Sequence, residues 1–485
     1  MSLKLSQFTE IGSEKSLSSE NHILFILTEK EEFDIPFAES LRAKLKRTNS
    51  EYKDLAKSPV SLDLPNGGIA SFVILAEKLN MFQRHVLLRK AAKLLLDEQP
   101  ERLAICVYGD EVSREAHACA GYYVTTVNAA ELPSRKKENK FKPLKNISIH
   151  GYAASHDYAY VNARVAGNTI CRQLTITPPN ELTPSVYREK VVTLAKDQGW
   201  KHEEFDMPAL KKMGAGAFYA VGQGSDPLDA AIVHLTYTPK AAKKHIALVG
   251  KGICFDTGGH NIKPAKYMQG MHEDMNGSAV TLGILLAATQ QQLPIKIDCW
   301  LAIAQNHIGP LAYKQNDVVT ALNGMTIEIV HTDAEGRMVL ADTLTLASRE
   351  KPDVIIDFAT LTGSMMAALG DRMSGVISNR PELACKAVGA GAEAGERIVA
   401  FPYDDDYESA LDSDIADIKQ CTLEGGADHI HAARFLGRFI ENDVAWLHVD
   451  LSSANCKGGL GAIQSDTNGF GVGFGIQMLK KLIEI

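Results

Sequence analysis

Residues 246–259 have the sequence IALVGKGICFDTGG, in which an apolar run passes directly into charged residues and glycines. The apolar part is typical of a strand buried on both faces of a sheet. Open α/β sheets place their ligand sites beyond the carboxyl ends of such strands. Charged residues seldom follow a buried strand into a glycine-rich turn unless something holds them. The stretch therefore predicts an α/β sheet with a functional site around Lys251 and Asp256.

Strand and helix patterns alternate on both sides of this stretch, which is typical of layered α/β domains. We expect a small N-terminal α/β domain plus a larger C-terminal α/β catalytic domain with a central mixed sheet flanked by helices. The predicted bounds are 1-150 for the N-terminal domain, 151-177 for a linker helix and 178-485 for the catalytic domain. Further strands are predicted at 23–27, 72–76, 103–107, 147–149, 297–303, 354–358 and 444–449, and helices over 86–96 and from Val161 up to Pro178.

Composition limits the class of protein. With 485 residues, 45% hydrophobic and 23% charged, the chain has the balance of a soluble globular protein of two or three domains. Its eight cysteines form no C-x-x-C pair, so we expect reduced core thiols. We see no signal-peptide pattern and no apolar run near the ~20 residues that span a bilayer, which predicts a cytoplasmic protein without membrane contact. The net charge of -8 argues against nucleic-acid binding.

A second cluster of charge lies at residues 331–337, with the sequence HTDAEGR. Asp333 and Glu335 are two positions apart, so in an extended backbone they would point the same way. With Asp256 and Asp274 they make four carboxylates, which would repel one another and take up protons if left unpaired. Two divalent cations would neutralise them, and such ligands suit zinc, manganese or magnesium without selecting among them.

Basic residues accompany these carboxylates. The Lys251 amine can bind a metal only when deprotonated, and adjacent dications lower its pKa in that direction. Lys263 and Arg337 would stay cationic and stabilise an oxyanion or a bound anion. Taken singly, an Asp-x-Glu pair on a loop is solvated surface or a helix cap, and a Gly-Gly pair is a turn. The combination favours a functional site.

Four segments form a longer pattern: VGKGICFDTGGHNIKP at 249–264, TDAEGR at 332–337, DFATLTG at 357–363 and NELTP at 180–184. Together they resemble the leucine (cytosol) aminopeptidase family of two-metal exopeptidases. The similarity covers roughly residues 165 to 485, in the right order and spacing. Over the N-terminal third, only the general plan of a small α/β domain matches.

The resemblance implies a metal-dependent aminopeptidase that removes the N-terminal residue, leucine-like by preference, from peptides with a free N-terminus. A metal-bridged hydroxide would attack the scissile carbonyl, and one of two ions (Mn2+ or Zn2+, with Mg2+ compatible) would bind the α-amino group. Lys263 would stabilise the oxyanion, and Arg337 would position a bicarbonate-like anion that carries the proton. The implied metal ligands are Lys251, Asp256, Asp274, Asp333 and Glu335, with Asp256 and Glu335 bridging, and the implied substrate pocket holds Met271, Thr360 and Gly363.

The chain also departs from the family pattern. His331 stands where the family usually has asparagine, and His260 and the run 272–276 also differ from the commonest versions. His331 is open to three interpretations, an added ligand, a proton carrier or a hydrogen-bonding substitute for asparagine, and we favour the substitute. The family is usually hexameric, which implies a homohexamer. The alternatives to a peptidase are a DNA-binding regulator of the same family, against which the acidic net charge speaks, and a purely structural homologue.

Overall fold

The computed structural model describes residues 3–30, 34–138 and 141–484. The chain forms two compact units, Met1–Val165 with Lys457–Asn468, and Ala166–Cys456 with Gly469–Ile485. Along the chain, the division after Val165 falls within helix α5 (Ala159–Ile176).

The first unit is built on a six-stranded sheet in the order β1-β6-β5-β2-β4-β3. Its pairs are parallel except for β3 with β4. Both faces of β2 are buried, because Leu24 and Ile26 pack on α3 and α4 while Ile23 and Phe25 belong to the core beneath α2. The elements are β1 (Lys4–Phe8), α1 (Glu14–Leu17), β2 (His22–Leu27), α2 (Ala38–Arg47), η1 (Tyr52–Ala56), β3 (Val60–Asp63), β4 (Ile69–Ile74), α3 (Met81–Leu96), β5 (Arg102–Val107), α4 (Glu111–Asn128) and β6 (Asn146–His150).

The second unit contains an eight-stranded sheet in the order β15-β14-β17-β13-β9-β10-β8-β7 and a small sheet in the order β11-β12-β16. The strands are β7 (Lys201–Asp206), β8 (Ala231–Tyr237), β9 (Lys244–Asp256), β10 (Ile295–Asn306), β11 (Val318–Thr320), β12 (Thr326–Glu328), β13 (Val354–Ala359), β14 (Ser374–Ser378), β15 (Ile398–Ala400), β16 (Ile418–Lys419) and β17 (Ala445–Asp450). The helices are α6 (Pro184–Gln198), α7 (Met207–Met213), α8 (Gly216–Gly222), α9 (Ala265–Met268), η2 (Met271–Met275), α10 (Asn276–Gln290), α11 (Glu335–Arg349), α12 (Gly363–Leu369), α13 (Pro381–Ala394), η3 (Asp405–Leu411), α14 (Asp428–Gly437) and α15 (Val472–Ile483).

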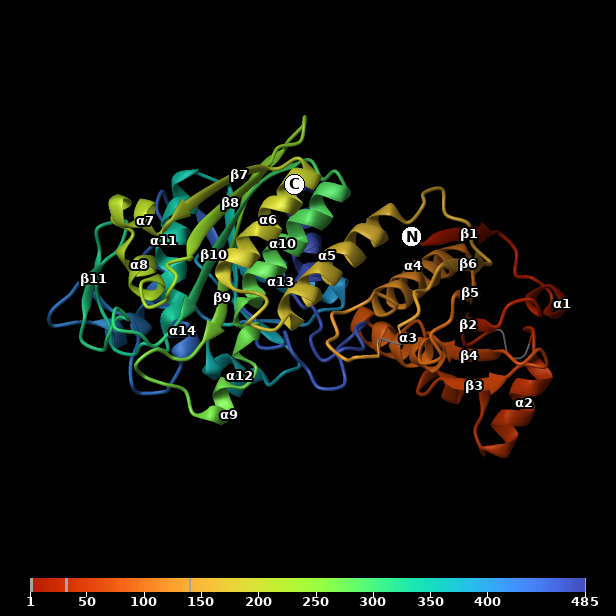
Figure 1. Cartoon of the computed structure of the whole chain (residues 1–485). Coiled ribbons are helices and arrows are strands. Elements are labelled where there is room, and N and C mark those ends of the chain that lie inside the picture. The colour runs from red at the N-terminus through yellow and green to blue at the C-terminus, as the bar shows by residue number, and fades with distance from the viewer. Residues whose placement is uncertain (1–2, 31–33, 139–140, 485) are drawn as a thin grey trace. The chain divides into compact units, whose positions relative to one another are not determined.

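The four central strands β10, β9, β13 and β17 are mutually parallel, so their carboxyl ends meet at one edge of the sheet. Strands β8 and β14 pair antiparallel to this set, which makes the sheet mixed. Figure 1 shows α6 and α10 on one side of β8–β10 and α7, α8 and α11 on the other. Ala247 and Val249 of β9 pack in the core on the α8 and α11 side.

The predicted fold class is confirmed, and each predicted strand lies within or overlaps an observed one. The helix expected over 86–96 begins earlier, at Met81, because the Asn80 side chain caps it in a reciprocal pair with Gln83. The cysteines are thiols outside any disulfide bond, and six of the eight are buried as expected, whereas Cys119 is half-buried and Cys385 is exposed. In the described part of the chain, no helix combines the length and apolar character needed to cross a membrane.

Candidate metal centre

The candidate site lies at the carboxyl edge of the central strands. Strand β9 contributes Lys251 and ends at Asp256, which is in register with Asn306 at the end of β10. Asp274 comes from η2, which precedes α10. Asp333 lies in the turn before α11, and Glu335 is the first residue of that helix. Segments up to 84 residues apart in sequence thus meet at one point, from Lys251 to Glu335.

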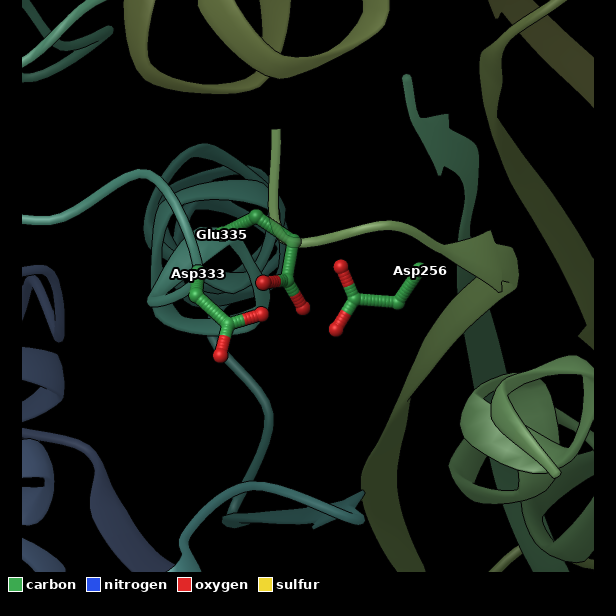
Figure 2. A group of neighbouring side chains, drawn as sticks. All are labelled: Asp256, Asp333 and Glu335. Carbon is green, nitrogen blue, oxygen red and sulfur yellow. The ribbon is translucent and has the colours of Figure 1, made fainter. Parts of the chain in front are cut away.

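Asp256, Asp333 and Glu335 form the centre of the site. One carboxylate oxygen of each lies within 4.8 Å of the others, and Figure 2 shows the three carboxylates converging. The expectation that Asp333 and Glu335 share a face of extended backbone is wrong. The chain turns at Ala334 (φ -103°, ψ 36°) and enters α11, so convergence comes from a helix start. A helix N-terminus favours the negative charge of Glu335.

Lys251 extends the site from the triad to Asp274. Its Nζ lies 2.8 Å from Asp274 Oδ2, 3.0 Å from Glu335 Oε1 and 3.0 Å from the Thr360 carbonyl oxygen. Burial alone would lower the pKa of Lys251, but the charges of Asp274 and Glu335 outweigh it and raise it. In this state Lys251 is an ammonium ion, and it could bind a metal only after cations replace its proton.

Lys263 occupies the other side of the triad. Its Nζ lies 2.8 Å from Asp256 Oδ2 and 2.5 Å from Asp333 Oδ1. Burial would lower the pKa of Lys263, but Asp256, Glu335 and Asp333 together raise it. The lysine therefore presents a fixed positive charge beside the three carboxylates.

The site carries more negative than positive charge. Four buried or half-buried carboxyl groups face two ammonium groups, so full ionisation of the four leaves two negative charges in excess. Burial raises the pKa of Asp274 and Glu335, and burial with the charge of Asp256 raises that of Asp333. Burial thus disfavours the charged form of these carboxyl groups, and bound cations would stabilise it. The donor set, oxygen-rich and convergent, fits divalent metal ions.

Two residues that sequence reasoning missed hold this arrangement. Asn306 Nδ2 donates to Asp256 Oδ1 at 2.8 Å and to the Thr332 carbonyl oxygen at 3.0 Å. Gln420 Oε1 accepts from the backbone of His331 at 3.2 Å, while Gln420 Nε2 donates to Ala334 O at 3.0 Å. Asn306 follows an apolar strand as Asp256 does, so the same pattern could have found it. Gln420 sits in no recognisable motif.

At two glycine positions of the motifs, a larger residue would clash with the site. A Cβ on Gly336 would lie 2.7 Å from both Cε and Nζ of Lys251, so the helix start leaves room for the lysine. Gly258 has φ +84°, and a Cβ there would lie 3.0 Å from Asp333 Oδ1. Both positions require glycine because side chains of the site, Lys251 and Asp333, lie directly against the backbone there.

Arg337 lies in the first turn of α11 and is buried. Its Nη1 donates to the Gln420 carbonyl oxygen at 3.0 Å, and its Nη2 lies 2.9 Å from both oxygens of Asp428. Burial would lower the pKa of Arg337, but the charge of Asp428 raises it.

The three expected pocket residues lie on two elements and the link between β13 and α12. Met271 opens η2 and is half-buried. Thr360 follows β13, and its Oγ1 donates to Asp274 Oδ1 at 2.8 Å. Gly363 opens α12, and a Cβ there would meet open space.

The two unusual histidines have backbone partners. His331 Nδ1 accepts from the Asp333 amide at 3.2 Å, and burial together with Lys263 and Arg337 lowers the pKa of His331. His260 Nδ1 donates to the Tyr313 carbonyl oxygen at 2.9 Å. Both contacts are ones that a side-chain amide can also make.

A profile of the "Cytosol aminopeptidase family, catalytic domain" matches residues 169–479. The chain belongs to this family. Its relatives include proteins named "Probable cytosol aminopeptidase" from Rhodopseudomonas palustris, 32% identical over 90% of this chain and 88% of the relative, and from Pseudomonas fluorescens, 42% identical over 66% of this chain. The aligned part spans 65% of the Pseudomonas fluorescens protein, and also 65% of a Nitrobacter winogradskyi relative that is 39% identical.

Solved structures of the family share the fold. A mutant of tomato leucine aminopeptidase is 26% identical with a TM-score of 0.87, covering 99% of this chain and 97% of that one. A bottromycin maturation enzyme in complex with Mn is 27% identical with a TM-score of 0.84, covering 96% of this chain and 100% of that one. The family predicted from the sequence is confirmed.

Proposed function

We propose that the chain is a metal-dependent aminopeptidase, a hydrolase that removes the N-terminal residue from peptides with a free N-terminus. One observation carries the proposal: four convergent carboxylates exceed their two lysine partners in charge, at the carboxyl edge of a parallel sheet. Family membership and the names of the relatives support the same activity.

Lys251, Asp256, Asp274, Asp333 and Glu335 are the residues that would hold two divalent ions. The related structure with Mn supports manganese, and zinc and magnesium suit the same oxygen donors. When bound, two such ions would hold the substrate's α-amino group and lower the pKa of the attacking water.

Lys263 is the residue we assign to oxyanion stabilisation. Its ammonium is fixed between Asp256 and Asp333, so it is ready to face charge that develops on the scissile carbonyl oxygen. Met271, Thr360 and Gly363 are proposed to line the pocket for the first side chain, which we expect to prefer leucine-like residues. Open space at Gly363 is consistent with a substrate group there.

The sequence pattern supports a cytoplasmic location and an N-terminal domain at 1-150 joined by a linker helix at 151-177 to the catalytic domain at 178-485. The family resemblance supports a homohexamer. Lys263 and Arg337 are the proposed catalytic pair, and the resemblance implies an oxyanion at the Arg337 guanidinium. No observation on the described residues favours the DNA-binding alternative.

The test uses the purified full chain, stripped of metal and then given Mn2+ or Zn2+. Leucine amide should be cleaved only after metal is restored, and the same substrate with an acetylated amine should not be cleaved. Asp333→Ala should abolish activity and Lys263→Ala should lower it about 10²–10³-fold. Lys266→Ala, an exposed lysine nearby on α9, is the matched control and should leave activity unchanged. Full activity in Asp333→Ala would refute the proposal.

A further inference from the structure

The hydrogen bonds of Arg337 identify the anion that this guanidinium holds. Its side chain is 2% exposed, and that of Asp428 is 28% exposed. Nη2 contacts both carboxylate oxygens of Asp428 at 2.9 Å, and Nη1 is bonded to the Gln420 backbone. Nε has no hydrogen-bond partner among the described residues.

These contacts already supply the guanidinium with an anion. Nη1 is bonded to the Gln420 carbonyl oxygen and Nη2 to both oxygens of Asp428, so the Nη1 and Nη2 edge is taken within the chain. A guanidinium typically pairs with one oxyanion through such an edge. A diffusible bicarbonate-like anion would therefore meet an arginine whose charge is already paired with a carboxylate that the chain itself supplies at a fixed position.

We propose that the Asp428 carboxylate takes the place of the diffusible anion at Arg337, so that hydrolysis by this chain needs no bicarbonate. The inference rests on the proposed aminopeptidase function and specifies one part of its site. Asp428 suits the task because it opens α14, contacts the buried Arg337 two positions beyond Glu335 and keeps part of its surface exposed.

The carboxylate can perform the proton transfer that the resemblance assigns to an external anion. As the water oxygen bonds to the carbonyl carbon, one water proton passes to Asp428. When the carbon–nitrogen bond breaks, that proton passes to the departing amine nitrogen, and Asp428 is again a carboxylate. No proton or electron is gained or lost over the cycle.

The first measurement uses the wild-type, metal-loaded enzyme in carbon-dioxide-free buffer with leucine amide. We expect its kcat to change less than twofold when bicarbonate is added. A wild-type enzyme that needs bicarbonate for full activity would overturn the inference. A wild-type protein with no metal-dependent activity would instead refute the proposed function, so the two failures are distinguishable.

The second measurement uses two substitutions of the same residue. Asp428→Ala empties the position, so activity without bicarbonate should fall about 10²-fold or more, as expected for loss of a proton carrier. Millimolar bicarbonate should raise the activity of Asp428→Ala at least tenfold, because the buried guanidinium then regains an anion. Asp428→Asn fills the position with a neutral amide, so it should be equally impaired and not rescued.

Controls separate this outcome from damage to the fold. Glu424→Ala removes an exposed carboxylate from the same loop and should behave as wild type with and without bicarbonate. Metal content and thermal unfolding of each variant are measured alongside. Full activity of Asp428→Ala in bicarbonate-free buffer would overturn the inference, as would a folded, metal-loaded Asp428→Ala that bicarbonate does not rescue.

Discussion

Buried carboxylates at the two ends of strand β10 have opposite surroundings, one carboxylate with many donors near the start and four carboxylates with two lysines near the end. Near the start of β10, Asp298 is 1% exposed and is surrounded by donors. His234 Nε2 and Thr236 Oγ1 each lie 2.9 Å from it, Lys296 Nζ lies at 3.2 Å, and His245 is also bonded to it. At the other end of the strands, four carboxylates share two lysines.

The two groups differ in the direction of their pKa shifts. Burial would raise the pKa of Asp298, but hydrogen bonds from His234 and His245 outweigh it and lower the pKa. In the candidate metal centre, burial raises the pKa of Asp274 and Glu335 in spite of Lys251. A buried carboxylate with enough donors stabilises the fold, whereas a group with excess charge requires a ligand. The direction of the carboxyl pKa shift therefore separates the structural cluster at Asp298 from the functional cluster, independently of sequence motifs.

The largest expected effect comes from Glu335→Gln. Loss of a bridging ligand should lower kcat/KM by about 10³-fold or more, since metal ions contribute several kcal/mol to such reactions. Yet the metal-free protein should unfold at the same temperature as wild type or higher, because the substitution removes a charge whose burial is unfavourable. Assays with leucine amide and thermal unfolding in chelator measure the two effects.

Glu350→Gln is the matched control, since it changes an exposed glutamate just beyond the same helix. It should alter neither activity nor stability. A clear loss of metal-free stability in Glu335→Gln would show that the carboxylate is a structural partner like Asp298, and the comparison would fail.

Asp298→Asn should have the opposite signature. Removing one partner from a buried charge cluster leaves the others unsatisfied and should cost about 3 kcal/mol of unfolding free energy. Protein that remains folded should keep kcat/KM within about twofold, because Asp298 lies near the start of β10 and the candidate site near its end. Denaturant unfolding measures the loss of unfolding free energy. Asp97→Asn is the control, because Asp97 forms an exposed ion pair with Lys93 and its substitution should change that free energy by close to zero.

The stabilisation by Asp298 should depend on pH in a defined direction. A carboxyl group with a lowered folded-state pKa contributes fully above its ordinary pKa of about 3.9, and the contribution is lost as pH falls. The difference in unfolding free energy between wild type and Asp298→Asn should therefore be constant near pH 6 and shrink by roughly 1–2 kcal/mol toward pH 3. A difference that grows on acidification would contradict the assigned sign.

The sequence predicted the fold and the position of the candidate site where a local pattern of apolar residues is followed directly by reactive side chains. Apolar runs such as 246–249 predicted the central strands, and the charged residues that follow them predicted which edge carries the site. The motif glycines predicted turns, although the role of Gly336 in making room for Lys251 needed coordinates. The direction of Glu335 was missed because a helix start two residues after Asp333 has no period-two signal.

Contacts between distant segments were beyond the sequence. Gln420 holds the loop at 330–334 from more than 80 positions away, and Asp428 reaches Arg337 across 91 positions. Neither residue type indicates a buried partner, since glutamine and aspartate side chains on loops are mostly solvated. The cluster around Asp298 could not be predicted either, because its histidine partners come from neighbouring strands and only the fold defines the order of those strands.

The smallest effect is expected for His331→Asn. His331 Nδ1 accepts one hydrogen bond from the Asp333 amide, which an asparagine side-chain oxygen can also accept. Because that bond contributes only about 1 kcal/mol, kcat/KM should change less than about threefold and metal affinity should not change. His331→Leu, which keeps bulk but cannot accept, should lose more activity than His331→Asn. A fall in metal affinity in both variants, measured by titration with Mn2+, would instead make His331 a ligand and add it to the group with excess charge.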